Sequence, residues 1–322
     1  MLWNSTPARL CVWTLCFSLA ACAIALVGAG RAYGEQAPGG HAGGHFPRTL
    51  NRHDGTEIVI ARKPSRIVSL SLGTDEVLCA LVSPDRIAAL SRHAGEPEVS
   101  NVAGIAQRVG VFASRNAEHI VSLRPDLVLA ARYTKAELRQ LIEQTGAPVV
   151  LLADFGNLAD IEANIRLIGA AIGEEARAEQ TIGTMRARLA LARRGLKSER
   201  RGERILYLAP GHWTAGAETN LHEIIATAGL RNAAAEAGLS GHVKIPVELV
   251  LRLDPEVILI GTGYARDSGF RERLLADAQL APLAAIKRQR IIELPSRYVQ
   301  TVSQHLADAA GALVEAINAL PD

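Results

Sequence analysis

Two segments of the chain, EHIVSLRPDLVL (residues 118–129) and ELVLRLDPEVIL (residues 248–259), share one pattern. In register, both read Glu, four residues, Leu, one residue, Pro, an acid and then an apolar run. A carboxylate favours the positive end of a helix dipole, and the residue before a proline is disfavoured in a helix. Each segment therefore predicts a short helix that begins near Glu118 or Glu248 and ends before the proline, followed by a buried strand. The repeat indicates two related lobes.

Strands and helices alternate around both segments. Apolar strands separated by helices are typical of a parallel sheet that is covered on both faces. We therefore predict an α/β fold with two Rossmann-like lobes of mainly parallel strands. The first lobe has predicted strands at 57–60, 66–70, 86–90, 126–130 and 148–152, and helices at 74–82, 117–123 and 135–144. The second has strands at 204–208, 257–260 and 290–294, and helices at 221–228, 247–253, 269–278 and 301–320.

A long helical stretch, residues 158–196, separates the lobes. Isoleucines recur at three- and four-residue spacing from Ile161 to Ile172, as on a helix with one buried side. Gly173 and the two glutamates after it predict a break and a new helix start. The first half, about 16 residues, would reach on the order of 24 Å, so we expect it to connect the lobes stiffly. The predicted organisation is a signal peptide at 1–34, a flexible leader at 35–56, the first lobe at 57–156, the linker helix at 157–200 and the second lobe at 201–322.

The N-terminal stretch has the order of a secretory signal. Arg9 precedes the apolar run 10–30, and small residues precede Glu35 at the positions that signal cleavage requires. The run is long enough to span a bilayer, so an uncleaved anchor stays open. The sequence LAAC ending at Cys22 resembles a bacterial lipobox, so a lipid anchor at Cys22 is a third interpretation. All three place the remainder outside the cytoplasm, in the periplasm. The Gly- and His-rich residues that follow predict a flexible leader.

Charge and cysteine content narrow the class of protein. The chain has 35 basic and 33 acidic residues, and residues 1–34 hold two Arg and no acid, which leaves 33 of each sign. This balance argues against a nucleic-acid partner. Cys79 is the one cysteine after residue 34, and its apolar surroundings in the sequence predict a buried, inert thiol.

Motifs of the common enzyme classes are missing from the sequence. It contains no HExxH, GxSxG or HxH pattern and no phosphate loop of the GxxxxGK[ST] type. We therefore expect no enzyme, no catalytic residue and no protein-bound metal. Two alternatives stay open, which are an exported metal-dependent hydrolase and a binder or sensor of a bare metal ion.

Three segments carry a family resemblance. RIVSLSLGTDEVL (66–78), DRIAALS (85–91) and LRPDLVLA (123–130), with the central helical stretch, resemble the periplasmic binding proteins for iron-siderophores, haem and vitamin B12. The resemblance extends from residue 66 to the C-terminus. It implies one rigid helix between two lobes, a ligand in the cleft between them, no cofactor, a monomer, and an ABC importer as partner. It also implies that a Glu on each lobe, by position Glu118 and Glu248, docks against arginines of the importer's membrane subunits, for which bidentate Arg–carboxylate pairs are suited.

Ligand contacts in such a fold are expected on loops at the carboxyl ends of the strands. Aromatic residues make up only 4% of the chain, yet several fall in these loops. Aromatic faces suit a large planar or macrocyclic ligand, and Arg suits its carboxylates. His93 or His212 could ligate a metal centre, although a structural histidine is the simpler interpretation. The candidate ligand-binding residues are Ser71, Arg92, His93, Phe112, Tyr133, His212, Trp213, Tyr264, Arg297 and Tyr298.

The ligand class follows from the resemblance. Haem binders of the family often carry a Tyr in the loop that corresponds to residues 109–116, and vitamin B12 binders carry a Trp there. This chain has Phe112 and neither of those residues, which argues against haem. The expected ligand is a metal chelate, either a ferric siderophore or a cobalamin-like compound.

Overall fold

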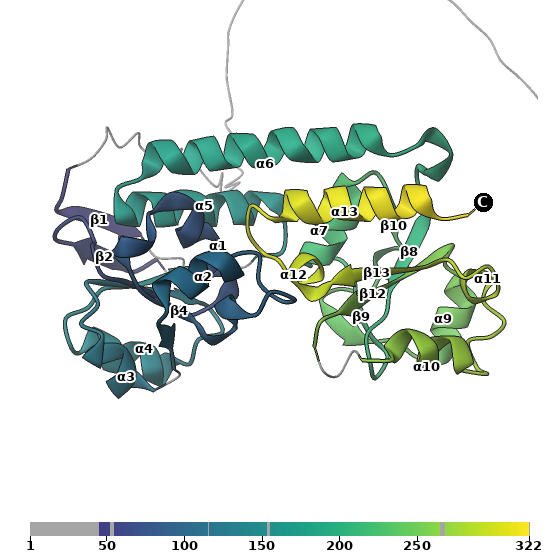
Figure 1. The fold of residues 1–322 in the computed structure, drawn as a ribbon, viewed down its shortest axis with the longest axis horizontal. Helices are drawn as coiled ribbons and strands as arrows, with labels where there is room; N and C mark the ends of the chain where they lie inside the picture. The colour runs from purple at the N-terminus through teal and green to yellow at the C-terminus, as the bar shows by residue number, and fades with distance from the viewer. Residues whose placement is uncertain (1–44, 52–54, 115, 153–154, 265–267, 322) are drawn as a thin grey trace, which may run out of the picture. The chain divides into compact units, whose positions relative to one another are not determined.

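Two parallel β-sheets organise the part of the chain described by the computed structural model, which comprises residues 45–51, 55–114, 116–152, 155–264 and 268–321. Both sheets belong to one compact unit that extends from Gly43 to Asp322 (Figure 1). The predicted signal peptide and Cys22 lie outside the described residues. The α/β class and the two-sheet organisation are confirmed.

The first sheet has the strand order β5-β4-β3-β6-β7 and is parallel throughout. Alternate residues of its central strands enter different cores. Ile67 and Leu127 pack in the cluster that includes Leu78 of α1, whereas Val68 and Val128 pack in the cluster on the other face. The elements of this lobe are β3 (Ile67–Ser69), α1 (Leu72–Leu81), β4 (Ile87–Ser91), α2 (Ala103–Val109), β5 (Phe112–Ala113), α3 (Ala117–Ser122), β6 (Leu127–Ala131), α4 (Ala136–Glu143) and β7 (Val149–Leu152).

The second sheet repeats this arrangement with the order β10-β8-β12-β13, again parallel. Ile205 and Leu259 pack in one core cluster, and Leu206 and Ile258 pack in another. The elements are β8 (Arg204–Tyr207), α7 (Asn220–Thr227), β10 (Arg231–Asn232), α8 (Ala233–Glu236), α9 (Val247–Leu253), β12 (Val257–Thr262), α10 (Phe270–Ala276), α11 (Ala284–Lys287), β13 (Ile291–Pro295), α12 (Ser296–Val299) and α13 (Leu306–Ala319).

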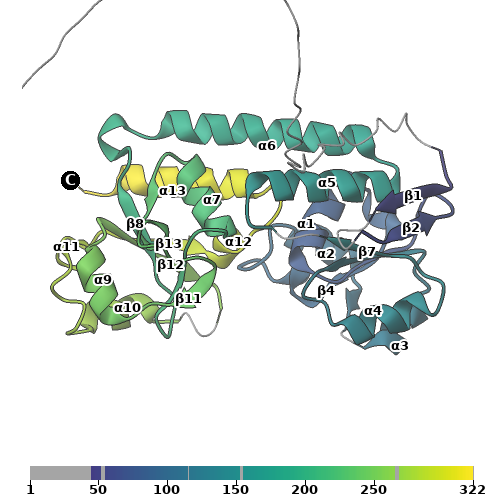
Figure 2. The same ribbon diagram turned by 180° about the vertical axis from the view of Figure 1, so that it is seen from behind.

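The connection between the lobes differs from the prediction. The stretch forms two helices, α5 (Leu158–Ile172) and α6 (Glu175–Gly195), and α5 ends at Gly173 in the left-handed conformation, with φ 73°. Figures 1 and 2 show α6 lying along α5 and then along α13 of the second lobe. The expectation that the first half connects the lobes is therefore wrong, because the chain reverses at Gly173 and α6 makes the crossing.

Smaller differences concern short strands, among them β5 and β10, which were not predicted. The end of the predicted leader forms β1 (Arg48–Asn51), which pairs antiparallel with β2 (Glu57–Ile60) because Leu50 and Ile58 are buried. The strand β2 therefore belongs to this pair and not to the parallel sheet. A second antiparallel pair, β9 (Trp213–Ala215) with β11 (His242–Lys244), was not predicted. None of the described helices is long and apolar enough to cross a membrane.

Candidate ligand-binding cleft

The ten candidate residues all lie at the carboxyl ends of parallel strands or in the loops that follow them. This is the edge where an open α/β sheet binds its ligands. In the first lobe, Ser71 follows β3, Arg92 and His93 follow β4, Phe112 lies on β5 and Tyr133 follows β6. In the second, His212 and Trp213 follow β8, Tyr264 follows β12, and Arg297 and Tyr298 follow β13.

Direct contacts join the two carboxyl edges. The backbone N–H of Arg297 donates to the carbonyl of Glu98 at 3.0 Å, and its guanidinium donates to the carbonyl of Pro97 at 3.1 Å. A Cβ on Gly263, which follows β12, would lie 2.7 Å from Cβ of Glu98. The loop after β4 therefore touches the loops after β12 and β13, and the strand ends of the two lobes face each other there.

Exposed aromatic and cationic side chains lie along these edges. Tyr133 is 75% exposed and Trp213 is 43% exposed, which is unusual for rings of this size. Lys244, paired with Trp213 across β9 and β11, places Nζ 5.9 Å from the centre of the Trp213 ring. The Arg297 guanidinium lies 4.9 Å from the centre of the Tyr298 ring. These groups offer flat apolar surfaces beside positive charge.

The two candidate histidines are held in different ways. His93 Nδ1 lies 2.9 Å from Glu96 Oε1, and both side chains are partly exposed. His212 has a positive φ of 58°, which is uncommon for a residue with a Cβ, and its carbonyl accepts from the N–H of Ile245 at 2.8 Å. In the described ranges, no group of three or more His, Cys, Asp and Glu side chains could hold a metal ion.

Ser71, predicted as a ligand contact, has a structural role at the start of α1. It is 4% exposed and caps α1, accepting from the N–H of Thr74 at 3.3 Å. Its own N–H donates to the Thr74 hydroxyl at 3.2 Å, which completes a capping box. The start of α1 is thereby fixed directly after β3.

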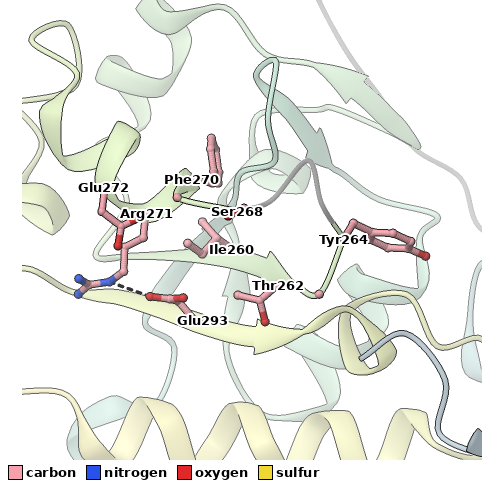
Figure 3. A pocket seen from close by; sticks show the side chains of 10 residues that line it. Ile260, Thr262, Tyr264, Ser268, Phe270, Arg271, Glu272 and Glu293 are labelled. Carbon is pink, nitrogen blue, oxygen red and sulfur yellow. Dashed lines mark ion pairs between the residues drawn. The ribbon is translucent and has the colours of Figure 1, made fainter. Parts of the chain in front are cut away.

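A cavity of about 370 Å³ opens beside Tyr264 in the second lobe (Figure 3). Thr262 and Tyr264 line it at the end of β12, and the Arg271–Glu293 ion pair, at 2.9 Å, borders it on the other side. The Tyr264 hydroxyl also donates to Gln300 Oε1 at 3.2 Å. Thr262, Lys244 and the pair Arg271–Glu293 could not be predicted from the sequence, because none of them stands in a recognisable motif.

The repeated segments form matching structures in the two lobes. Glu118 and Glu248 are each the second residue of a short helix, α3 and α9, and both are exposed. The residue between Leu and Pro is left-handed in both, with φ 49° at Arg124 and 37° at Asp254. The predicted course of helix, stop and buried strand is confirmed twice. Neither carboxylate forms an ion pair with another residue in the described part of the chain.

Two parallel-sheet lobes whose strand ends face each other are typical of two-lobed binding proteins. Residues 67–298 match the periplasmic binding protein family, and the chain belongs to that family. It is a substrate-binding protein of the kind that serves ABC transporters, and not an enzyme, so the alternative of an exported hydrolase is wrong.

The individual relatives share between 19% and 26% sequence identity with this chain. An uncharacterized ABC transporter substrate-binding lipoprotein of Bacillus subtilis (strain 168), YvrC, is 25% identical over 281 residues, covering 84% of this chain and 86% of the relative. The periplasmic heme-binding protein RhuT from Roseiflexus sp. RS-1, in apo form, matches with a TM-score of 0.69 at 26% identity over 79% of this chain and 97% of that chain. The molybdate-binding protein MolA of Haemophilus influenzae has a TM-score of 0.69 at 19% identity, over 84% of this chain and 90% of that chain, and shows the fold alone.

Proposed function

We propose that this protein captures a metal chelate, a ferric siderophore or a cobalamin-like compound, outside the cytoplasm and delivers it to the membrane subunits of an ABC importer. The observation that carries the proposal is the composition of the facing strand ends. Exposed Tyr133 and Trp213 lie there with Lys244 and Arg297. Flat apolar faces beside cations complement a chelate that has aromatic or macrocyclic surfaces and acidic groups.

The metal would arrive with its own ligands. The described residues provide no cluster of three metal-binding side chains, and His93 is already paired with Glu96. The relative RhuT, whose name describes a heme-binding protein, is consistent with a metal-containing macrocycle as ligand. The Phe at position 112 in place of a Tyr still favours other chelates over haem in this chain.

A fluorescence titration tests the ligand class directly. Trp213 is the single tryptophan after residue 34, so the emission of the mature protein reports on the proposed cleft. We expect saturable quenching by at least one ferric siderophore or cobalamin in a panel that also contains haem, molybdate and free ferric iron. Saturation by free iron alone would refute the proposal and support the bare-metal alternative.

The role of individual cleft residues needs a matched pair of variants. Tyr133→Ala should weaken binding of the chelate that is identified about tenfold, since one aromatic contact contributes about 0.5–1.5 kcal/mol beyond its buried area. Leu191→Ala removes a similarly exposed side chain, 62% exposed, from the linker helix α6 and should leave the affinity unchanged. Equal effects of the two changes would remove Tyr133 from the site.

Docking to the importer is proposed for Glu118 and Glu248. Their equivalent positions and exposure in the two lobes support this role. Reversing both charges, Glu118→Arg with Glu248→Arg, should abolish uptake by cells and leave the ligand affinity intact. The control is Glu57→Arg with Glu315→Arg, which reverses one exposed charge in each lobe, on β2 and α13, and leaves α3 and α9 unchanged. If the control lowers uptake equally, the effect is one of overall charge and not of docking.

Attachment to the membrane is proposed to occur through a lipid at Cys22, as an alternative to a soluble periplasmic form. The Bacillus relative that is named a lipoprotein supports this form. Cys22→Ser should move the protein from the membrane fraction to the soluble fraction. An unchanged distribution, with the mature N-terminus at Glu35 by mass spectrometry, would show cleavage of an ordinary signal peptide instead.

A further inference from the structure

Glu76 is a buried carboxylate of the first lobe that accepts hydrogen bonds from the second lobe. It lies on α1 and is 2% exposed. Its Oε2 accepts from the hydroxyls of Thr301 at 2.8 Å and Ser303 at 2.6 Å. Both hydroxyls belong to the segment between α12 and α13 of the second lobe. Burying a carboxylate costs free energy unless hydrogen bonds satisfy it. Because the second lobe supplies two of these bonds, the burial of Glu76 is favourable only while the two lobes remain in contact here.

The same carboxylate is connected to the ligand cleft. Its Oε1 accepts from Asn101 Nδ2 at 2.7 Å, and that nitrogen also donates to the carbonyl of Arg297 at 2.8 Å. The N–H of Arg297 in turn donates to Glu98 of the first lobe. A continuous series of hydrogen bonds therefore runs from α1 through Asn101 to the residue that is a candidate ligand contact.

A third connection comes from the backbone. The side-chain amide of Gln304 in the second lobe donates from Nε2 to the carbonyl of Glu76 at 2.8 Å. The neighbouring Asp75 is also fully buried but accepts from Ser91 of its own lobe. The two adjacent acids thus have different roles, and Glu76 alone of the pair joins the lobes.

We propose that Glu76 is a positioning residue that holds the segment from Arg297 to Gln304 against the first lobe and thereby sets the width of the ligand cleft. Every contact that supports this role of Glu76 is made within the protein, so the role is the same whichever ligand is bound. If Glu76 does not have this role, the proposed chelate binding is unaffected.

Hydrogen exchange measured by NMR on the ligand-free protein tests the role. The reporter is the amide of Arg297, whose backbone hydrogen bond crosses between the lobes. The reference amides are Leu208 and Val128, each bonded within its own sheet region, and Gln300, bonded within α12. The variant is Thr301→Val, which removes one hydroxyl from Glu76 with little change of shape.

A matched control exists in the same lobe. Thr214 is 0% exposed, and its hydroxyl has no hydrogen-bond partner in the part of the chain that is described, so Thr214→Val makes the same chemical change away from Glu76. We expect Thr301→Val to accelerate exchange at Arg297 about tenfold, the effect of losing one hydrogen bond to a charged group. The control and the three reference amides should not change.

A second variant identifies Glu76 as the acceptor. In a Glu76→Gln background, Thr301→Val should accelerate exchange at Arg297 less than it does in the wild type, because the charged partner is already gone. Unchanged exchange at Arg297 in Thr301→Val, or an equal rise at Gln300, Leu208 and Val128, would overturn the proposal. If Glu76→Gln does not fold, the comparison of Thr301→Val with Thr214→Val still decides the question.

Discussion

Asp75 makes a quantitative prediction about the pH dependence of stability. Its carboxylate is completely buried, and this burial raises the pKa of Asp75 to about 7, although hydrogen bonds from Ser69 and Ser91 act in the opposite direction. The unfolded chain would release this proton near pH 3.9, the ordinary value for aspartate. Between those two pH values the folded protein therefore binds one more proton than the unfolded protein.

The sign and size of the effect follow from linkage. Because the folded state holds the extra proton, stability is greatest below the unfolded pKa and decreases as the pH rises toward 7. With a folded pKa of about 7, the loss from pH 5 to pH 7 is about 2 kcal/mol. Asp75→Asn replaces the titrating acid with a neutral group of the same shape and should remove this part of the pH dependence.

Urea unfolding at pH 5, 6 and 7 measures the difference between the wild type and Asp75→Asn. The wild type should lose about 2 kcal/mol relative to the variant over this interval. The control is Asp85→Asn, at an exposed aspartate whose pKa is lowered by the Ser83 hydroxyl, so it is ionised throughout the interval. A difference in the free energy of unfolding between wild type and Asp75→Asn that stays constant from pH 5 to pH 7 would show that Asp75 does not titrate in this interval.

Three further predictions concern substitutions or reactivity at single positions. Glu203→Gln should lower the free energy of unfolding by about 3–5 kcal/mol in a urea melt, because Arg290 donates to both Glu203 oxygens at 2.8 Å in a buried pair. An effect below 1 kcal/mol would show that the pair contributes little. Gly216→Ala should prevent folding, judged by circular dichroism, since its Cβ would lie 2.1 Å from the Leu239 carbonyl oxygen. The control is Gly183→Ala, which has open space around it on α6. It should raise the free energy of unfolding by about 0.5–1 kcal/mol. Cys79 should resist thiol reagents at pH 8 in the folded protein, because burial raises its pKa to about 12, and rapid labelling without unfolding would contradict this.

The parallel sheets could be predicted because their strands carry continuous apolar runs. Residues such as Val68 and Leu129 are buried whichever face they point to, so their pattern needs no knowledge of distant partners. The strands β5 and β10 have two residues each, which is too short to show any period. The reversal at Gly173 could be predicted as a break but not as a change of direction, because the direction depends on how α6 packs against α13.

The candidate cleft could likewise be predicted only in part. Topology alone places the loops after the strands at one edge, and all ten candidates lie there. The contacts that each side chain makes depend on residues far away in the sequence. Arg297 bonds to Pro97, and Glu76 bonds to Thr301. No local motif predicts such pairs, so the sequence could identify the edge and not the contacts across it.

The two kinds of contact between the lobes differ in what it costs to separate them. On the side of the long helices, one apolar cluster runs from Ile161 of α5 through Ile182 of α6 to Leu313 of α13. Separating it would expose apolar surface at about 25 cal/mol per Å². At the facing strand ends, the described contacts of Glu76 and Arg297 across the lobes are hydrogen bonds, and water can satisfy these groups once the lobes separate. Under the proposed docking at Glu118 and Glu248, a pull on both lobes would therefore open the cleft side first, while α6 keeps the lobes joined.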